Sequence, residues 1–201
     1  FKSVDGILYE KKKYMRMMVC PAMKQGIVTV ADGMHEIGTE AFHDCKYVTE
    51  VILPESLETI NSSAFEGCSA LEKIELPDNI EQIGMYAFED CTALKSVKLP
   101  ARLTDIDQAV FAGCESLENI VIPEGVTRIS EFTFNGCDNL QTVHLPDSLT
   151  SIGLLAFEYC HSLTSICIPK NVTSIEEAVF MKCENFQTIY GYGGTRAATY
   201  A

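Results

Sequence analysis

The chain has 201 residues, 47% of them hydrophobic and 21% charged, and a formal net charge of −13. This is the composition of an ordinary globular domain, and the length is sufficient for a sizeable core. The excess of carboxylates argues against nucleic acid, whose binding requires Lys and Arg to neutralise phosphates, and against electrostatic attachment to anionic lipid. No apolar run approaches the roughly 18 residues of a membrane-spanning helix, so we expect no membrane insertion in this segment.

The first 26 residues lack the regular pattern that follows them. Two apolar-rich segments, Val4 to Tyr9 and Tyr14 to Val19, flank a charged turn at Lys11 to Lys13. This arrangement is typical of a β-hairpin, and we expect residues 1–26 to cap the open edge of the structure that follows. Because the chain begins with Phe1 instead of Met, we expect it to be part of a longer or processed chain.

A strict repeat of 23 residues occupies the rest of the chain. A phenylalanine stands three residues before each of seven evenly spaced cysteines. Such a period predicts a stack of similar coils, each of which buries its apolar side only against its neighbours. The cysteines of this column are Cys45, Cys68, Cys91, Cys114, Cys137, Cys160 and Cys183.

The third repeat illustrates the structure expected of each coil. Alternation around Ile74 and Leu76 predicts a short β-strand with one face inward, and Pro77, which lacks an N–H donor, ends it. A polar turn and a second extended piece follow. The segment from Ala87 to Cys91 then predicts a helical turn that places Phe and Cys in the core at i and i+3.

Together these patterns predict a repeat solenoid that is mainly β with short helical turns. Equivalent strands should pair in parallel and in register, which gives a right-handed coil stack with a parallel sheet on one long face. Seven repeats and a final strand would occupy residues 27–190. Residues 191–201 would form a C-terminal cap segment, so that the whole chain is one domain.

The seven column cysteines are expected to be buried, free thiols, since a free buried Cys behaves as a small hydrophobe. Neighbouring members could come close enough to bridge, but an odd number cannot pair completely. Cys20 and Cys167 lie outside the column. They are about six coils, roughly 29 Å, apart, which is too far for a disulfide within one chain.

The repeat resembles a known family. Leu71-x-x-Ile74-x-Leu76 matches the strand signature of leucine-rich repeats, although Pro77 stands where the usual family continues toward an Asn or Cys ladder. The run from Leu145 through Ala156 and Phe157 to Cys160 is similar to the BspA-type leucine-rich repeat. This resemblance implies a bacterial cell-surface or secreted protein, with an extracellular or surface location, that binds host protein, glycan or other cells. It transfers no particular ligand.

Function should lie where the period is broken. The outward positions of the strands do not repeat: the N-terminal half is charged, whereas the C-terminal half is nearly uncharged and rich in hydroxyl and aromatic groups. Such a surface could hold a protein loop or a sugar, although small polar residues also simply favour a sheet. The candidate binding face consists of Glu75, Lys98, Val121, Thr142, His144, Cys167, Thr188 and Tyr190.

A second candidate surface lies on the opposite side of the coils. It consists of apolar residues at positions that are Ser, Glu or Gln in other repeats, which indicates contact with a partner or a second copy. Local packing beside Phe157 is the alternative for two of them. The candidate residues are Met85, Tyr86, Phe132, Leu154 and Leu155.

No catalytic, metal or cofactor site is expected. The four histidines are dispersed, no Gly-rich phosphate loop occurs, and metal ligation needs three or four converging ligands. Only Cys167 and His144, one strand apart, resemble a nucleophile and base. The sequence therefore predicts a non-enzymatic interaction domain that acts through its strand face. A structural spacer within a larger surface protein is the alternative.

Overall fold

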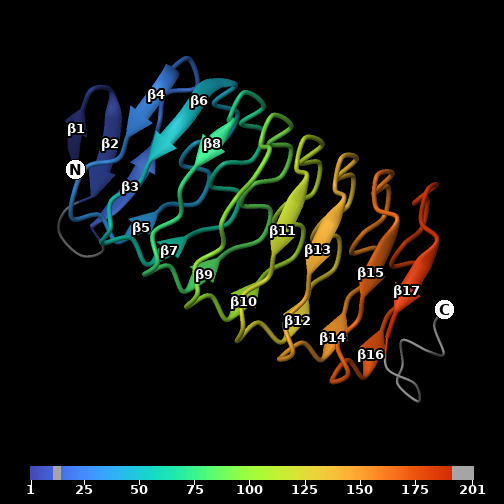
Figure 1. The fold of residues 1–201 in the computed structure, drawn as a ribbon. Coiled ribbons are helices and arrows are strands. Elements are labelled where there is room, and N and C mark those ends of the chain that lie inside the picture. The colour runs from blue at the N-terminus through green and yellow to red at the C-terminus, as the bar shows by residue number, and fades with distance from the viewer. Residues whose placement is uncertain (11–14, 192–201) are drawn as a thin grey trace.

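The computed structural model describes residues 1–10 and 15–191 and has the form of a β-solenoid of about eight turns. The turns contribute short strands to two rows, which run along opposite sides of the molecule (Figure 1). The first row, whose outer surface we call the strand face, contains β4 (Gln25–Thr29), β6 (Tyr47–Ile52), β8 (Lys73–Ile74), β11 (Asn119–Val121), β13 (Thr142–His144), β15 (Ser165–Cys167) and β17 (Thr188–Tyr190). The coil between β8 and β11 contributes only the isolated bridge of Ser96 with Asn119 to this row.

The second row is built from strands of two residues each. It follows the first row by half a turn and contains β5 (Glu36–Ile37), β7 (Thr59–Ile60), β9 (Gln82–Ile83), β10 (Asp105–Ile106), β12 (Arg128–Ile129), β14 (Ser151–Ile152) and β16 (Ser174–Ile175). These strands form the second extended piece that the repeat predicts in each coil.

Strand pairing follows the 23-residue period. Val51 lies opposite Ile74, and Ile166 lies opposite Ile189, in parallel register. The predicted coil stack with parallel strands is therefore confirmed. One irregularity occurs in β4, the first strand of its row, where the register with β6 shifts between Gly26 and Ile27.

Three antiparallel strands precede the first coil. β1 (Lys2–Val4) pairs with β2 (Ile7–Glu10), and β2 pairs with β3 (Arg16–Val19). β3 then pairs in parallel with β5, so this N-terminal unit extends the second row and not the strand face. The turn expected at Lys11 to Lys13, and all but residue 191 of the C-terminal cap expected at 191–201, lie outside the described residues.

The core consists of columns that run the length of the stack. Phenylalanine rings of consecutive coils stack from Phe42 to Phe180, with centroids 4.8 Å apart at the first pair and 5.7 Å at the last. From Cys68 to Cys183, each column thiol donates to the carbonyl of the phenylalanine in the preceding coil, as Cys114 does to Phe88 at 3.2 Å. The Cys45 thiol, at the start of the column, lies 3.8 Å from the Cys20 and Pro21 carbonyls. The column cysteines are free thiols, buried from Cys45 to Cys160 and half-buried at Cys183.

The helical turn expected from Ala87 to Cys91 is replaced by a pair of tight turns, and the described residues contain no helix. The N–H groups of Ala87 and Cys91 close turns within the coil, whereas those of Phe88 and Asp90 donate to the next coil. Tyr86 and Asp90 have positive φ values, 60° and 55°. Alternation of local and inter-coil bonds keeps Phe and Cys inward without a helix.

Candidate functional site

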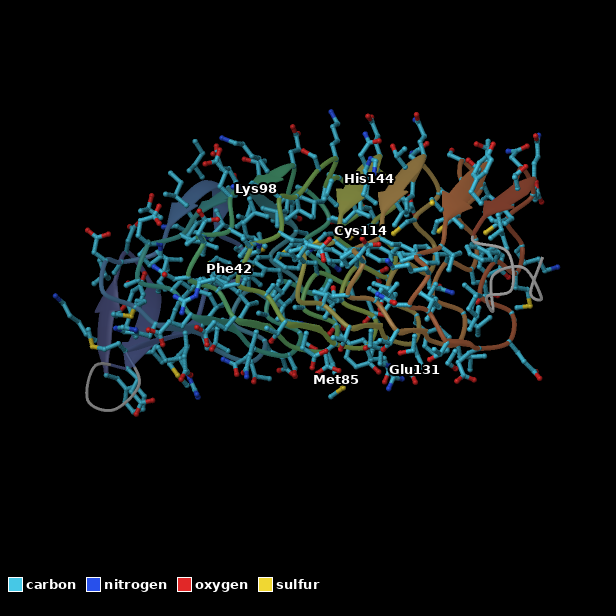
Figure 2. All side chains as sticks on the ribbon, turned by 60° about the horizontal axis from the view of Figure 1, so that its bottom comes forward. Phe42, Met85, Lys98, Cys114, Glu131 and His144 are labelled. Carbon is cyan, nitrogen blue, oxygen red and sulfur yellow. The ribbon has the colours of Figure 1, made fainter. Side chains whose placement is uncertain are left out.

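The outward side chains of the first row form a continuous exposed surface. Figure 2 shows Lys98 and His144 projecting from one side of the molecule, Met85 and Glu131 from the opposite side, and Phe42 and Cys114 in the core between them. All eight residues predicted for the binding face are exposed. The strands therefore place these side chains along one face, as the 23-residue period predicts.

The N-terminal half of the strand face carries a network of charges. Glu50 lies opposite Lys73 in the sheet, and the Lys73 amine is 3.3 Å from Glu50 Oε1 and 3.0 Å from Glu75 Oε1. The carboxylates of Glu75 and Glu50 raise the pKa of Lys73. Lys98 Nζ lies 3.7 Å from Asp78 Oδ1. These pairs are exposed, so each contributes little to stability.

A depression of about 690 Å³ opens on this charged half, and we call it the central depression. Its volume is within the range of about 300–1,000 Å³ that is usual for ligand sites. Its walls come from three successive coils, and two of the predicted residues, Glu75 and Lys98, line it. The lining consists of Glu50 to Leu53, Glu55, Lys73 to Asp78, Ser96 and Lys98.

The C-terminal half of the strand face is apolar at several exposed positions. Val121 lies opposite His144, and Cys167 lies opposite Tyr190. Val121 is 61% exposed and Tyr190 is 59% exposed, whereas the Thr142 hydroxyl bonds with Asn119 Oδ1. The two halves are thus chemically different, and the central depression does not extend to the second.

The cysteine chemistry of the structure separates the core thiols from Cys167. Burial raises the pKa of Cys68 to about 12 and raises the pKa values of Cys91 and Cys137 well above the ordinary thiol value. These thiols are consequently poor nucleophiles. Cys167 is exposed, but among the described residues no hydrogen bond joins it to His144.

The thiols at the two ends of the ladder differ from those in its interior. A hydrogen bond from the Cys45 thiol lowers the pKa of Cys20. A hydrogen bond from the Cys160 thiol likewise lowers the pKa of Cys183. The two residues differ in exposure: Cys20 is only 4% exposed, whereas Cys183 is half-buried.

The residues predicted for the apolar patch fall into two groups. Met85 and Tyr86 share one coil, whose backbone bonds to the coil of Gln108. Phe132 lies one coil beyond Gln108 and therefore two coils beyond Tyr86. Its N–H donates to the carbonyl of Leu154 in the next coil, and Leu155 follows Leu154. Met85 and Leu154 are 39% and 38% exposed. One intervening coil therefore separates the two groups.

Three of the four histidines lie beside carboxylates, and His43 lies near two of them, Asp44 and Glu66. His35 Nδ1 is 3.1 Å from Glu58 Oε1, and His161 Nε2 is 3.8 Å from Asp138 Oδ1. Within residues 1–10 and 15–191, no three His, Cys, Asp or Glu side chains converge in a group that could hold a metal ion.

The central depression and the end thiols were not found by sequence reasoning. The depression depends on how three coils lie against one another, which single-coil patterns do not encode. Its only sequence signal is the cluster of charges at outward positions from Glu50 to Lys98. Pairing of opposite charges across neighbouring strands explains the same cluster without a depression.

Parallel coils of 23 residues, an apolar strand signature and a non-repeating exposed strand row define a leucine-rich repeat solenoid. The family model described as "BspA type Leucine rich repeat region" matches residues 20–123 and 104–196. The chain belongs to this BspA-type leucine-rich repeat family. Domains of the class generally bind proteins and are typically non-catalytic.

Solved structures support the same assignment. The chain is similar to a leucine rich cell surface protein from Faecalibacterium prausnitzii, with 32% identity, a TM-score of 0.77, and coverage of 94% of this chain and 54% of that one. A leucine-rich repeat protein from Bacteroides ovatus has 32% identity and a TM-score of 0.85, with 94% and 52% covered. The T. pallidum leucine rich repeat protein has 28% identity and a TM-score of 0.81, with 92% and 90% covered.

The chain spans about half the length of the first two of these structures. No curated protein matches it. Family membership and the cell-surface relative indicate a surface location. The described residues include no helix that is long and apolar enough to cross a membrane.

Proposed function

We propose that this domain is a non-enzymatic interaction module, displayed outside the cell, that binds host protein or glycan through its strand face. The observation that carries the proposal is the contrast between the columns. The inward columns repeat in every coil because packing requires it, whereas the exposed row from Glu75 to Tyr190 varies at every step. Solenoids of this kind present such extended rows as binding surfaces.

The chemistry of the row supports a macromolecular partner over a reacting substrate. Charged groups surround the central depression, and exposed Val121 and Tyr190 lie further along the same face. Aromatic anchors beside polar groups are typical of interfaces. The proposed partner surface comprises Glu75, Lys98, Val121, Thr142, His144, Cys167, Thr188 and Tyr190.

A binding measurement with paired variants tests the proposal. The fluorescently labelled domain would be applied to cultured epithelial cells, to immobilised matrix proteins and to a glycan array. We expect the double substitution His144→Ala and Tyr190→Ala to lower binding by roughly tenfold or more, since truncation of an interface anchor commonly costs about 1–2 kcal/mol. Substitution of Glu177→Ala and Glu184→Ala, exposed residues outside the strand face, is the matched control and should leave binding unchanged.

A structural spacer is the second candidate function. The observation that favours it is the coverage of only about half of the first two similar structures, so that binding in such proteins can belong to another part. A folded domain that binds nothing on the cells, the matrix proteins and the array would support the spacer and contradict the interaction module.

A further inference from the structure

We propose that Cys20 and Cys45 are a disulfide site, and that a disulfide oxidant joins them and thereby ties the N-terminal strands to the first coil. The bridge is a covalent modification at one end of the solenoid and goes beyond the binding function of the strand face. Three observations carry it: the way in which Cys45 departs from the other column thiols, the contact between the two sulfurs, and the place of Cys20 in the fold.

All seven column thiols lie within the described residues, and only Cys45 lacks a short hydrogen bond to a carbonyl. From Cys68 to Cys183 the acceptor is the phenylalanine carbonyl 26 residues earlier, at 2.9–3.2 Å. The residue 26 positions before Cys45 is Val19. The Cys45 sulfur lies instead 3.8 Å from the carbonyl oxygens of Cys20 and Pro21. A thiol is a weak donor, so at this longer distance little holds the Cys45 sulfur in its reduced form.

Cys20 places a second sulfur against the first. A hydrogen bond joins the Cys45 thiol to the Cys20 sulfur, and the two residues are 4% and 0% exposed, respectively, for Cys20 and Cys45. Sulfurs already in contact can reach the S–S bond length of about 2.0 Å with little backbone movement. The same hydrogen bond lowers the pKa of Cys20, which favours the thiolate that attacks a disulfide.

Cys20 stands where the N-terminal strands meet the coils. It directly follows β3, and its N–H donates to the Ala41 carbonyl at 2.6 Å. β3 pairs with β5 through only two residue pairs, beside the ion pair of Arg16 with Glu36. The terminal units of a repeat stack have one neighbour and therefore open before the interior. A covalent bond at Cys20 acts at the place where such opening begins.

The bond forms by thiol–disulfide exchange. The Cys20 thiolate attacks one sulfur of the oxidant, whose S–S bond breaks and releases one thiol. The Cys45 sulfur loses its proton to solvent, attacks the Cys20 sulfur of the mixed disulfide and releases the second thiol. Two S–H bonds of the protein are replaced by one S–S bond, and the oxidant takes up both electrons and both protons.

The surroundings of a surface protein suit this reaction. Family membership and the cell-surface relative indicate a surface location, and disulfides form and persist outside the cytosol. Because both sulfurs are buried, we expect the exchange to be fast during folding and slow in the native state. The two cysteines are 25 residues apart, and a cross-link of that length constrains the unfolded chain and so opposes opening of the N-terminal unit.

Oxidative refolding of the whole chain tests the assignment. The chain would be refolded in a buffer of reduced and oxidised glutathione, and its free thiols would be alkylated with N-ethylmaleimide in denaturant before mass spectrometry. We expect alkylation of seven of the nine cysteines and a peptide that joins Cys20 to Cys45 and is released by dithiothreitol. Hydrogen exchange at the Gly38 amide, which donates to the Met17 carbonyl, should be at least tenfold slower in the oxidised form.

Two serine variants make the test specific. In Cys20→Ser all eight remaining cysteines should be alkylated, and exchange at Gly38 should be equal in oxidising and reducing buffer. Cys91→Ser is the matched control, because Cys91 is a buried column thiol that donates to the Phe65 carbonyl at 3.2 Å and a serine hydroxyl can donate to the same carbonyl. This variant should keep the bridge between Cys20 and Cys45.

Alkylation of all nine cysteines after oxidative refolding of the parent would overturn the proposal. A bridge between Cys160 and Cys183 in place of the expected one would overturn it as well. So would a bridge between Cys20 and Cys45 that leaves exchange at Gly38 unchanged, since the N-terminal unit would then not be tied down. These measurements involve no binding partner, so their failure is distinguishable from failure of the interaction function.

Discussion

Replacing Phe111 with alanine should remove about 3–5 kcal/mol from the free energy of unfolding. The ring is fully buried and stacks between Phe88 at 5.5 Å and Phe134 at 5.7 Å. The cost combines lost burial with the cavity that remains, for which Phe→Ala substitutions give about 3–5 kcal/mol. Against a typical stability of about 5–15 kcal/mol, this is a large fraction.

Phe111→Leu provides the comparison, because leucine retains most of the volume and loses only the two ring contacts. At about 0.5–1.5 kcal/mol for each contact, we expect leucine to cost about 1–3 kcal/mol. Both variants would be measured by guanidinium denaturation followed by circular dichroism. An alanine cost below about 1 kcal/mol, or equal costs for leucine and alanine, would refute the view that the phenylalanine column stabilises the stack.

Three further predictions concern single positions. Cys167 should react with a thiol reagent in the native state and the fully buried Cys114 only after unfolding, as mass spectrometry of labelled peptides would show; rapid native labelling of Cys114 would contradict the packed core. Glu89→Gln should raise the melting temperature at pH 7, because burial, Glu66 and Asp90 raise the pKa of Glu89 and a raised carboxyl pKa makes the fold less stable as pH rises through it. The gain in melting temperature should vanish below about pH 4, where the carboxyl is protonated in both states, and a gain that persists there would disprove this cause. Gly153→Ala should cost about 1–3 kcal/mol, because its Cβ would lie 2.8 Å from the Glu131 nitrogen; an unchanged denaturation midpoint would show that the coils can separate there.

The inward columns made most of the fold predictable. Residues such as Ile74 and Phe88 recur at each coil because a neighbour must pack on both sides of them, and this repetition is visible in one sequence. The parallel register, the 23-residue coil and the direction of the outward row follow from it. The same repetition predicts that His144 and Lys98 point outward from the strand face, and both are exposed there.

The turns were less predictable. Phe88 and Cys91 are three residues apart, and that spacing suits a helical turn as well as two tight turns. The difference lies in the positive φ values of Tyr86 and Asp90, which most non-glycine residues seldom adopt. Glycine at the Asp90 position of other coils, as at Gly67 and Gly113, is a sequence signal for that turn, whereas Tyr86 gives none. The central depression was missed for a related reason: its lining comes from three successive coils, and the pattern within a single coil does not show how they combine.

The register shift at Gly26 and Ile27 affects how readily two molecules can pair through their β4 edges. The N-terminal strands extend the second row, so β4 remains the edge of the strand-face sheet within the described residues. A regular edge strand with an exposed isoleucine would be a template for strand pairing between molecules. The register shift at Gly26 distorts that template, and we expect it to disfavour end-to-end association of the solenoids through β4.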